Sequence, residues 1–138
     1  MPKKLIIPYV SEQSNVFKKI KRPKLKLSIY SKYLKCWISI EDILADTGAD
    51  ISILPKSLGI LMVGNYKNGK RYRITGLLPE TATNMYLHKL SVRLADRKFK
   101  TTFAISNSND IPPTLGRVGG LDNLDIQYKR GQKIVIHW

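Results

Sequence analysis

Apolar and polar residues alternate along much of the chain, which is the pattern of half-buried β-strands. In Lys24–Tyr30 every second residue is apolar, namely Leu25, Leu27 and Ile29. A second segment of strand character, Tyr33–Glu41, follows after only two polar residues. The spacing therefore predicts a β-hairpin from these two segments.

Further short segments have the same strand character, and helical patterns are few. The predicted strands are Ile43–Ala45, Ile51–Leu54, Arg71–Thr75, Met85–Leu94, Lys98–Ile105 and Lys133–Trp138. Gly76–Asn84 reads as the tip of a hairpin, and Pro55–Leu61 as a helical turn. Leu115–Leu124 predicts a short C-terminal helix, which Gly119 and Gly120 weaken by about 1 kcal/mol each relative to alanine. Many short strands with so little helix predict an all-β fold, a closed or partly closed β-barrel.

The length of 138 residues fits one folded domain. The net charge is +14, and most of it lies early, because residues 1–35 hold ten Lys or Arg against the single acid Glu12. We therefore separate a basic N-terminal arm, 1–22, from a domain at 23–138. Such an arm could bind nucleic acid. We favour the alternative, a solvated surface, since the arm lacks the motifs and aromatic pattern of a nucleic-acid-binding module.

Cysteine and histidine are scarce, which limits the possible chemistry. Cys36 is the single cysteine, and the histidines are His88 and His137. A disulfide within the chain is excluded, which is typical of a reducing compartment, and no zinc-ligand spacing is present. We predict no metal and no cofactor. No apolar run reaches the roughly 18–20 residues of a membrane span, and no signal peptide is evident, so we predict a cytoplasmic protein without a membrane partner.

The segment Leu44–Asp50 reads L-A-D-T-G-A-D and has the features of a catalytic loop. An apolar strand leads into Asp46, and a glycine turn follows it. Gly48 permits close approach of the backbone and can offer its N–H group to the carboxylate. Thr47 can fix the loop by a hydrogen bond.

Peptide hydrolysis by carboxylates requires two of them, close together and sharing one proton. The chain holds a single D-T-G, and its other acids lie outside any similar apolar context. A two-fold axis through the site would supply the second carboxylate from another copy of the chain. We therefore predict a homodimer.

From Lys24 to Tyr128 the sequence resembles the retropepsin family, the dimeric aspartic proteases of retroviruses and their cellular and prokaryotic relatives. Leu44–Asp50 resembles the catalytic loop, and Arg71–Leu94 resembles the flap hairpin. Pro113–Arg117, P-T-L-G-R, resembles the segment that packs behind the catalytic loop. The Leu-Leu-Pro-Glu sequence after Gly76 departs from the glycine-rich flap tip of the family.

The resemblance implies an acid-protease barrel and a role for each matching residue. It implies catalytic roles for Asp46, Thr47 and Gly48, substrate contacts from Ala49, Asp50, Gly76, Leu77 and Leu78, and structural support from Leu115, Gly116 and Arg117. In this scheme Thr47 locks the two loops across the dimer axis, and Arg117 holds Asp50 in an ion pair. The chain ends of relatives form an intersubunit sheet, and Lys133–Trp138 has the alternation for that role or for pairing within one chain.

The implied function is an aspartic endopeptidase that cleaves a peptide or protein substrate with an activated water. The alternative is a catalytically silent module of the same fold, used for peptide binding or dimerisation. A third possibility is nucleic-acid binding through the arm at 1–22, with or without protease activity.

Overall fold

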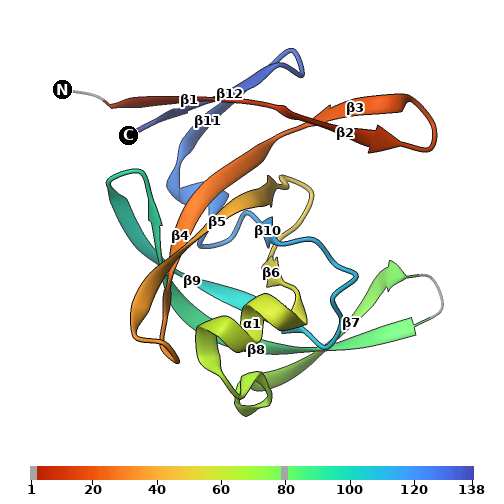
Figure 1. Ribbon diagram of the computed structural model, residues 1–138, viewed down its shortest axis with the longest axis vertical. Coiled ribbons are helices and arrows are strands. Elements are labelled where there is room, and N and C mark those ends of the chain that lie inside the picture. The colour runs from red at the N-terminus through yellow and green to blue at the C-terminus, as the bar shows by residue number, and fades with distance from the viewer. Residues whose placement is uncertain (1–2, 79–80) are drawn as a thin grey trace.

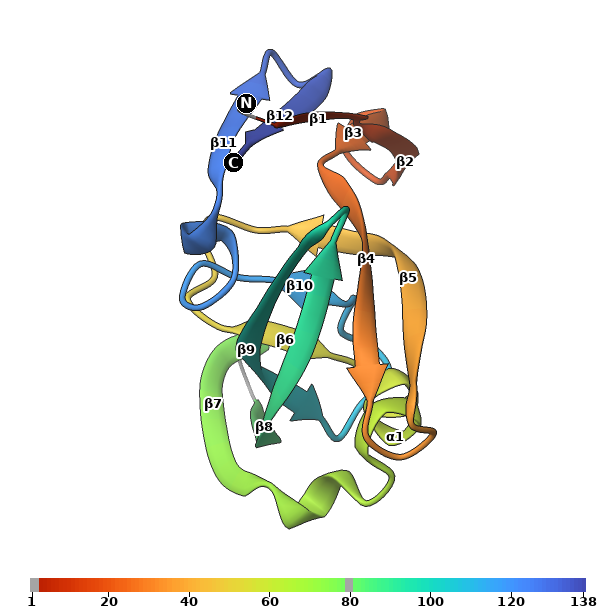
Figure 2. The ribbon, with the colours of Figure 1, turned by 90° about the vertical axis from the view of Figure 1, so that its left-hand side faces the viewer.

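Antiparallel strands dominate the structure, a computed structural model that describes residues 3–78 and 81–138 (Figure 1, Figure 2). The strands are β1 (Lys4–Pro8), β2 (Val10–Ser14), β3 (Lys18–Arg22), β4 (Lys24–Ser31), β5 (Cys36–Ala45), β6 (Ser52–Leu54), β7 (Lys70–Leu78), β8 (Thr81–Leu94), β9 (Arg97–Ser106), β10 (Thr114–Leu115), β11 (Asp125–Lys129) and β12 (Lys133–His137). The helical elements are α1 (Lys56–Val63) and the 3-10 turns η1 (Tyr66–Asn68) and η2 (Leu121–Asn123).

The largest sheet closes on itself. Its strands follow the order β4-β5-β10-β6-β9-β8-β7, and β4 pairs again with β8 through Ser28↔Arg93 and Ile29↔Val92. Six strands therefore form a closed barrel, while β7 extends from β8. The interior holds fully buried side chains, among them Leu25, Leu27, Ile29, Ile43, Leu90, Val92, Phe103, Ile105 and Leu115. The prediction of an all-β closed barrel is confirmed.

The first hairpin has a wider turn than the sequence predicts. Its second strand begins at Cys36 rather than Tyr33, and Tyr33 and Leu34 lie in the turn with 62% and 49% of their surface exposed. The Ser31 hydroxyl accepts the Leu34 N–H at 2.9 Å, and the Ser31 carbonyl accepts the Lys35 N–H at 2.8 Å. These bonds hold the turn residues in place of strand pairing.

The two predicted helices have different outcomes. The helical turn predicted at Pro55–Leu61 is present as α1, where Pro55 is the N-cap residue and Gly64 ends the helix at φ +71°. The helix predicted over Leu115–Leu124 is wrong in extent, because only the 3-10 turn η2 forms there. Gly119 has a φ of +72°, which a right-handed helix cannot continue.

The flap-like hairpin has longer strands and a shorter tip than predicted. β7 and β8 remain paired to Leu78↔Thr81, with a register shift between Ile74 and Leu78. Residues 76–78 and 81–84 therefore belong to strands rather than to a tip. Pro79 and Glu80, which the prediction places in the tip, lie outside the described residues.

The two ends of the chain meet in a separate three-stranded sheet with the order β1-β12-β11. The predicted strand at the C-terminus thus pairs within one chain, from Lys4↔His137 to Pro8↔Lys133. Ile134 and Ile136 of β12 are fully buried and belong to the barrel's hydrophobic core. Between β1 and the barrel, β2 and β3 form a two-stranded ribbon that projects from the body (Figure 1).

Asp96, in the turn between β8 and β9, ties both chain ends to the barrel. The Trp138 Nε1–H donates to Asp96 Oδ1 at 3.1 Å, and Lys3 forms an ion pair with the same carboxylate. The hydrogen bond from Lys3 is the main cause that holds the pKa of Asp96 below its ordinary value of 3.8. The Asp96 carboxyl binds its proton less readily in the folded chain than in the unfolded chain, so the contact stabilises the fold at pH values above 3.8. This stabilisation is lost as the pH falls through the lowered pKa of Asp96 in the folded chain.

Replacing Asp96 by asparagine should therefore lower the melting temperature at neutral pH, by an amount that shrinks as the pH falls below 3.8. Thermal unfolding of both proteins across the acid range measures the difference. Asp42→Asn, which removes an exposed carboxylate from β5, is the control. A difference between wild type and Asp96→Asn that stays constant with pH would contradict the assigned linkage.

Among the described residues, no helix combines the length and the apolar character that a membrane crossing requires.

Candidate active site

Asp46 follows directly on β5, at a point where the strand is pinned to β10. The two strands run parallel, with Leu44 opposite Thr114 and Ala45 opposite Leu115. The Asp46 N–H continues this pairing by donating to the Leu115 carbonyl at 3.1 Å. The strand thus delivers Asp46 from the buried barrel wall to a half-buried position.

The loop itself orients the Asp46 carboxylate. The Gly48 N–H donates to Asp46 Oδ1 at 2.9 Å, and the Ala49 N–H donates to the Asp46 carbonyl at 3.2 Å. A Cβ atom at Gly48 would lie 3.3 Å from Oδ1, so glycine leaves room for the carboxylate at this distance. Thr47 and Gly48 are exposed in the single chain.

The segment after β10 holds the far side of the loop through backbone hydrogen bonds. The Arg117 N–H donates to the Ala49 carbonyl and the Val118 N–H to the Asp50 carbonyl, both at 2.9 Å. In the buried layer beneath, the Gly116 N–H donates to Ser52 Oγ at 3.0 Å. The structure therefore brings together two motifs that lie about 70 residues apart in the sequence.

The expected ion pair is present, but it is long and exposed. Arg117 Nη1 lies 3.8 Å from Asp50 Oδ1, and 86% of the Asp50 side chain is exposed. The same guanidinium lies closer to Asp122, with Nη2 and Oδ2 3.3 Å apart. Exposed pairs of this kind contribute roughly 0–1 kcal/mol, so the backbone bonds dominate the support of the loop.

The fold agrees with that of a known protease. A retropepsin-like aspartic protease from Rickettsia conorii matches with a TM-score of 0.66 and 14% sequence identity, over 100% of this chain and 93% of that one. The chain has the retropepsin-like fold. The protease of EIAV, in complex with the inhibitor HBY-793, matches with a TM-score of 0.48 and 21% identity, over 81% of this chain and 93% of that one. No protein-family model and no curated protein sequence matches the chain.

Within this retropepsin-like chain, the predicted flap residues Gly76, Leu77 and Leu78 belong to β7. Their side chains lie outside what the structure describes. The β7–β8 hairpin and the loop after β5 are on the same side of the molecule (Figure 1).

The structure also brings Tyr128 on β11 within electrostatic range of Asp46, which the sequence did not reveal. Burial is the main cause that raises the pKa of its phenol, and the nearby Tyr9 and Asp46 charges add to the effect. The sequence could not indicate this proximity, because Tyr128 lies more than 80 residues after Asp46 and only the fold of the terminal sheet brings the two closer.

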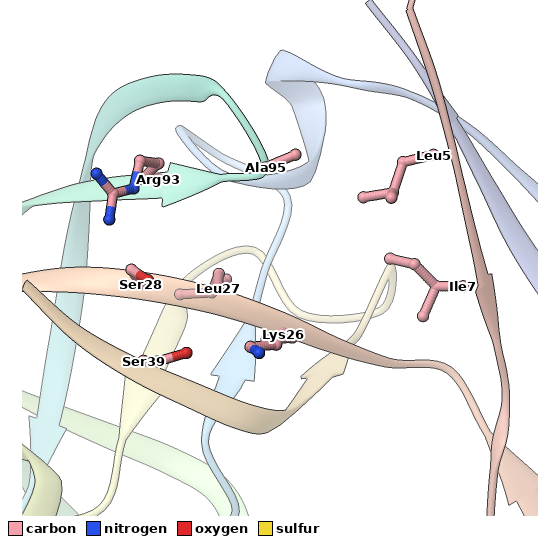
Figure 3. A pocket seen from close by; sticks show the side chains of 8 residues that line it. All are labelled: Leu5, Ile7, Lys26, Leu27, Ser28, Ser39, Arg93 and Ala95. Atoms are coloured by element: carbon pink, nitrogen blue, oxygen red, sulfur yellow. The ribbon is translucent and has the colours of Figure 1, made fainter.

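The hollow in Figure 3 lies elsewhere, between β1 of the terminal sheet and the barrel wall. Leu5 and Ile7 line it from β1, and the facing residues are Lys26, Leu27, Ser28, Ser39, Arg93 and Ala95. None of these residues is a carboxylate, so this hollow cannot perform the chemistry expected of Asp46. A second hollow does adjoin the loop that carries Asp46 and is lined partly by Asp50, Ile51 and Val118.

No group of three or more His, Cys, Asp or Glu side chains that could hold a metal ion occurs in residues 3–78 and 81–138.

Proposed function

We propose that the chain is one subunit of a homodimeric aspartic endopeptidase whose active site pairs Asp46 with its symmetry copy. The observation that carries the proposal is the held carboxylate. Asp46 is half-buried at the end of a core strand, accepts the Gly48 N–H, and stands on a loop fixed by the 115–118 segment. The retropepsin-like fold supports the same conclusion at the level of architecture.

Pairing across a two-fold axis gives the two carboxylates opposite tasks. Two carboxyl groups about 3 Å apart share one proton, because both cannot be ionised at that distance. The ionised Asp46 takes a proton from water as the water oxygen bonds to the peptide carbon. The protonated Asp46 of the second copy gives its proton to the carbonyl oxygen. The intermediate then collapses: the C–N bond breaks as the first Asp46 passes its proton to the leaving nitrogen. A hydroxyl of the intermediate gives its proton to the carboxylate of the second copy, which restores the starting state of the pair.

The substrate in this proposal is a peptide in extended form. Such a peptide adds as a strand beside the β7–β8 hairpin, where backbone groups form hydrogen bonds and pockets receive alternate side chains. Ala49 and Asp50 would contact its backbone from the loop, and Gly76, Leu77 and Leu78 would cover it from β7. Thr47 would link the two loops at the axis.

Digestion of a mixture of unstructured peptides tests whether the chain is an enzyme or a silent binding module. We expect cleavage at internal peptide bonds, with the product ends identified by mass spectrometry from about pH 3 to 8, because a carboxylate pair that shares one proton is active only within a limited pH range. A silent module of the same fold would bind peptides and leave them intact. Intact peptides across the whole range would reject the enzymatic proposal.

A further inference from the structure

A basic surface forms where the β2–β3 ribbon meets the turn between β11 and β12. Lys21 Nζ donates to Gln132 Oε1 at 2.9 Å, and the Tyr9 N–H donates to the Gln132 carbonyl at 2.9 Å. The first of these contacts joins two residues that lie 111 positions apart in the sequence. We call the combined surface the basic ridge, which consists of Lys19, Lys21, Lys129, Arg130 and Lys133.

The strand register places Lys19 and Lys21 on one face of the ribbon and Glu12, the acid of residues 1–22, on the other. In the β2–β3 ribbon, Ser11 is opposite Lys21 and Gln13 is opposite Lys19, so these four side chains share one face. Glu12 lies on the other face, where it forms ion pairs with Arg22 and Lys24. The face that carries Lys19 and Lys21 therefore holds no carboxylate.

The turn between β11 and β12 extends the ridge with further basic and amide side chains. A hollow there is lined by Tyr128, Lys129, Arg130, Gln132 and Lys133. All five cations of the ridge are exposed, and Tyr128 shows 37% of its surface. At the tip of the ribbon Phe17 is 71% exposed. Cations and amide groups thus occur along one surface, and the ring of Tyr128 lines the hollow beside them.

We propose that the basic ridge binds single-stranded nucleic acid, an activity separate from peptide cleavage. Lysine and arginine side chains neutralise phosphates and release counterions, and aromatic rings stack on unpaired bases. The interleaved Ser11, Gln13 and Gln132 can form hydrogen bonds with phosphate or sugar. A membrane surface fits less well, because this face of the ribbon presents polar side chains between its lysines rather than the apolar face that insertion requires.

The test is fluorescence anisotropy of the full chain with a labelled single-stranded oligonucleotide of about 20 nucleotides, long enough for one binding site. If all five cations contact phosphates, affinity should fall roughly 100-fold between 50 and 200 mM salt. The triple variant Lys19→Gln, Lys21→Gln, Arg130→Gln should bind at least about tenfold more weakly and show a shallower salt dependence. A duplex of equal length should bind more weakly than the single strand, since its bases are not free to stack.

The matched control removes the same charge from exposed lysines elsewhere, by Lys32→Gln, Lys35→Gln and Lys67→Gln. It should bind within about threefold of wild type, because charges away from the ridge act only through the screened long-range field. Thermal unfolding verifies that both variants fold. An equal loss in the control, absence of oligonucleotide binding, equal binding of the duplex, or binding to anionic vesicles instead of the oligonucleotide would each overturn the proposal.

Discussion

Replacing Asp46 by asparagine should abolish peptide cleavage and leave the fold intact. Asparagine keeps a side-chain oxygen that can accept the Gly48 N–H, so the loop geometry now fixed by the 2.9 Å bond to Oδ1 persists. It cannot take a proton from water or share one with a second carboxylate. General acid–base catalysis contributes about 10²–10⁴-fold for each group, and the change affects both copies, so cleavage should fall about a thousandfold or more. Peptide turnover by the purified variant measures the loss.

The matched control for this variant is Asp110→Asn, which removes an exposed carboxylate from the loop before β10. It should retain cleavage close to that of wild type. Sedimentation of Asp46→Asn should still show the proposed dimer, because removing a like charge from the axis relieves repulsion. Substantial cleavage by Asp46→Asn would disprove the role that we assign to Asp46.

Replacing Gly116 by alanine should destabilise the chain and disturb the loop at Asp46. A Cβ atom at this position would lie 2.5 Å from the Ile51 carbonyl oxygen and 2.9 Å from that of Ala49. Both are backbone atoms, one in the loop Leu44–Asp50 and one in the residue that follows it, and they cannot move aside as a flexible side chain can. Inserting a methyl group into so close a contact costs about 1–3 kcal/mol of the free energy of unfolding. Chemical denaturation measures this quantity.

Gly131→Asn is the control for the Gly116 variant. Gly131 lies in the turn between β11 and β12 at φ +66°, and no atom lies within 4 Å of a Cβ built there. Asparagine tolerates the left-handed region, so the stability should change little. If Gly116→Ala were as stable as wild type, the close packing behind the loop that carries Asp46 would be refuted.

Much of the barrel could be predicted because strand alternation is a local signal. The alternation in Lys24–Tyr30 indicates directly that Leu25, Leu27 and Ile29 face a core, as they do in β4. It does not report which strand lies beside β4, so the closure through Ser28↔Arg93 had to come from the structure. The prediction that the second strand begins at Tyr33 was wrong. Tyr33 and Leu34 are apolar like strand residues, but they lie exposed in a turn.

The candidate site shows the same division between local and tertiary information. The D-T-G loop and the L-G-R segment could be read as motifs, and the fold brings them together through the bonds of Arg117 and Val118. The sequence could not predict that Arg117 lies closer to Asp122 than to Asp50. The η2 turn brings Asp122 back beside Arg117, and the chain enters this turn through the positive φ of Gly119. The contact between Lys21 and Gln132 likewise joins the two ends of the chain.

The most direct test of the central proposal is subunit mixing. Wild-type chains and Asp46→Asn chains are equilibrated in varying proportions, and peptide cleavage is measured at constant total protein. If each active site takes one Asp46 from each chain, only wild-type pairs are active. Activity should then fall as the square of the wild-type fraction, to about one quarter at equal amounts. A linear fall, to about one half, would contradict the shared site, because each chain would then carry a complete active site of its own.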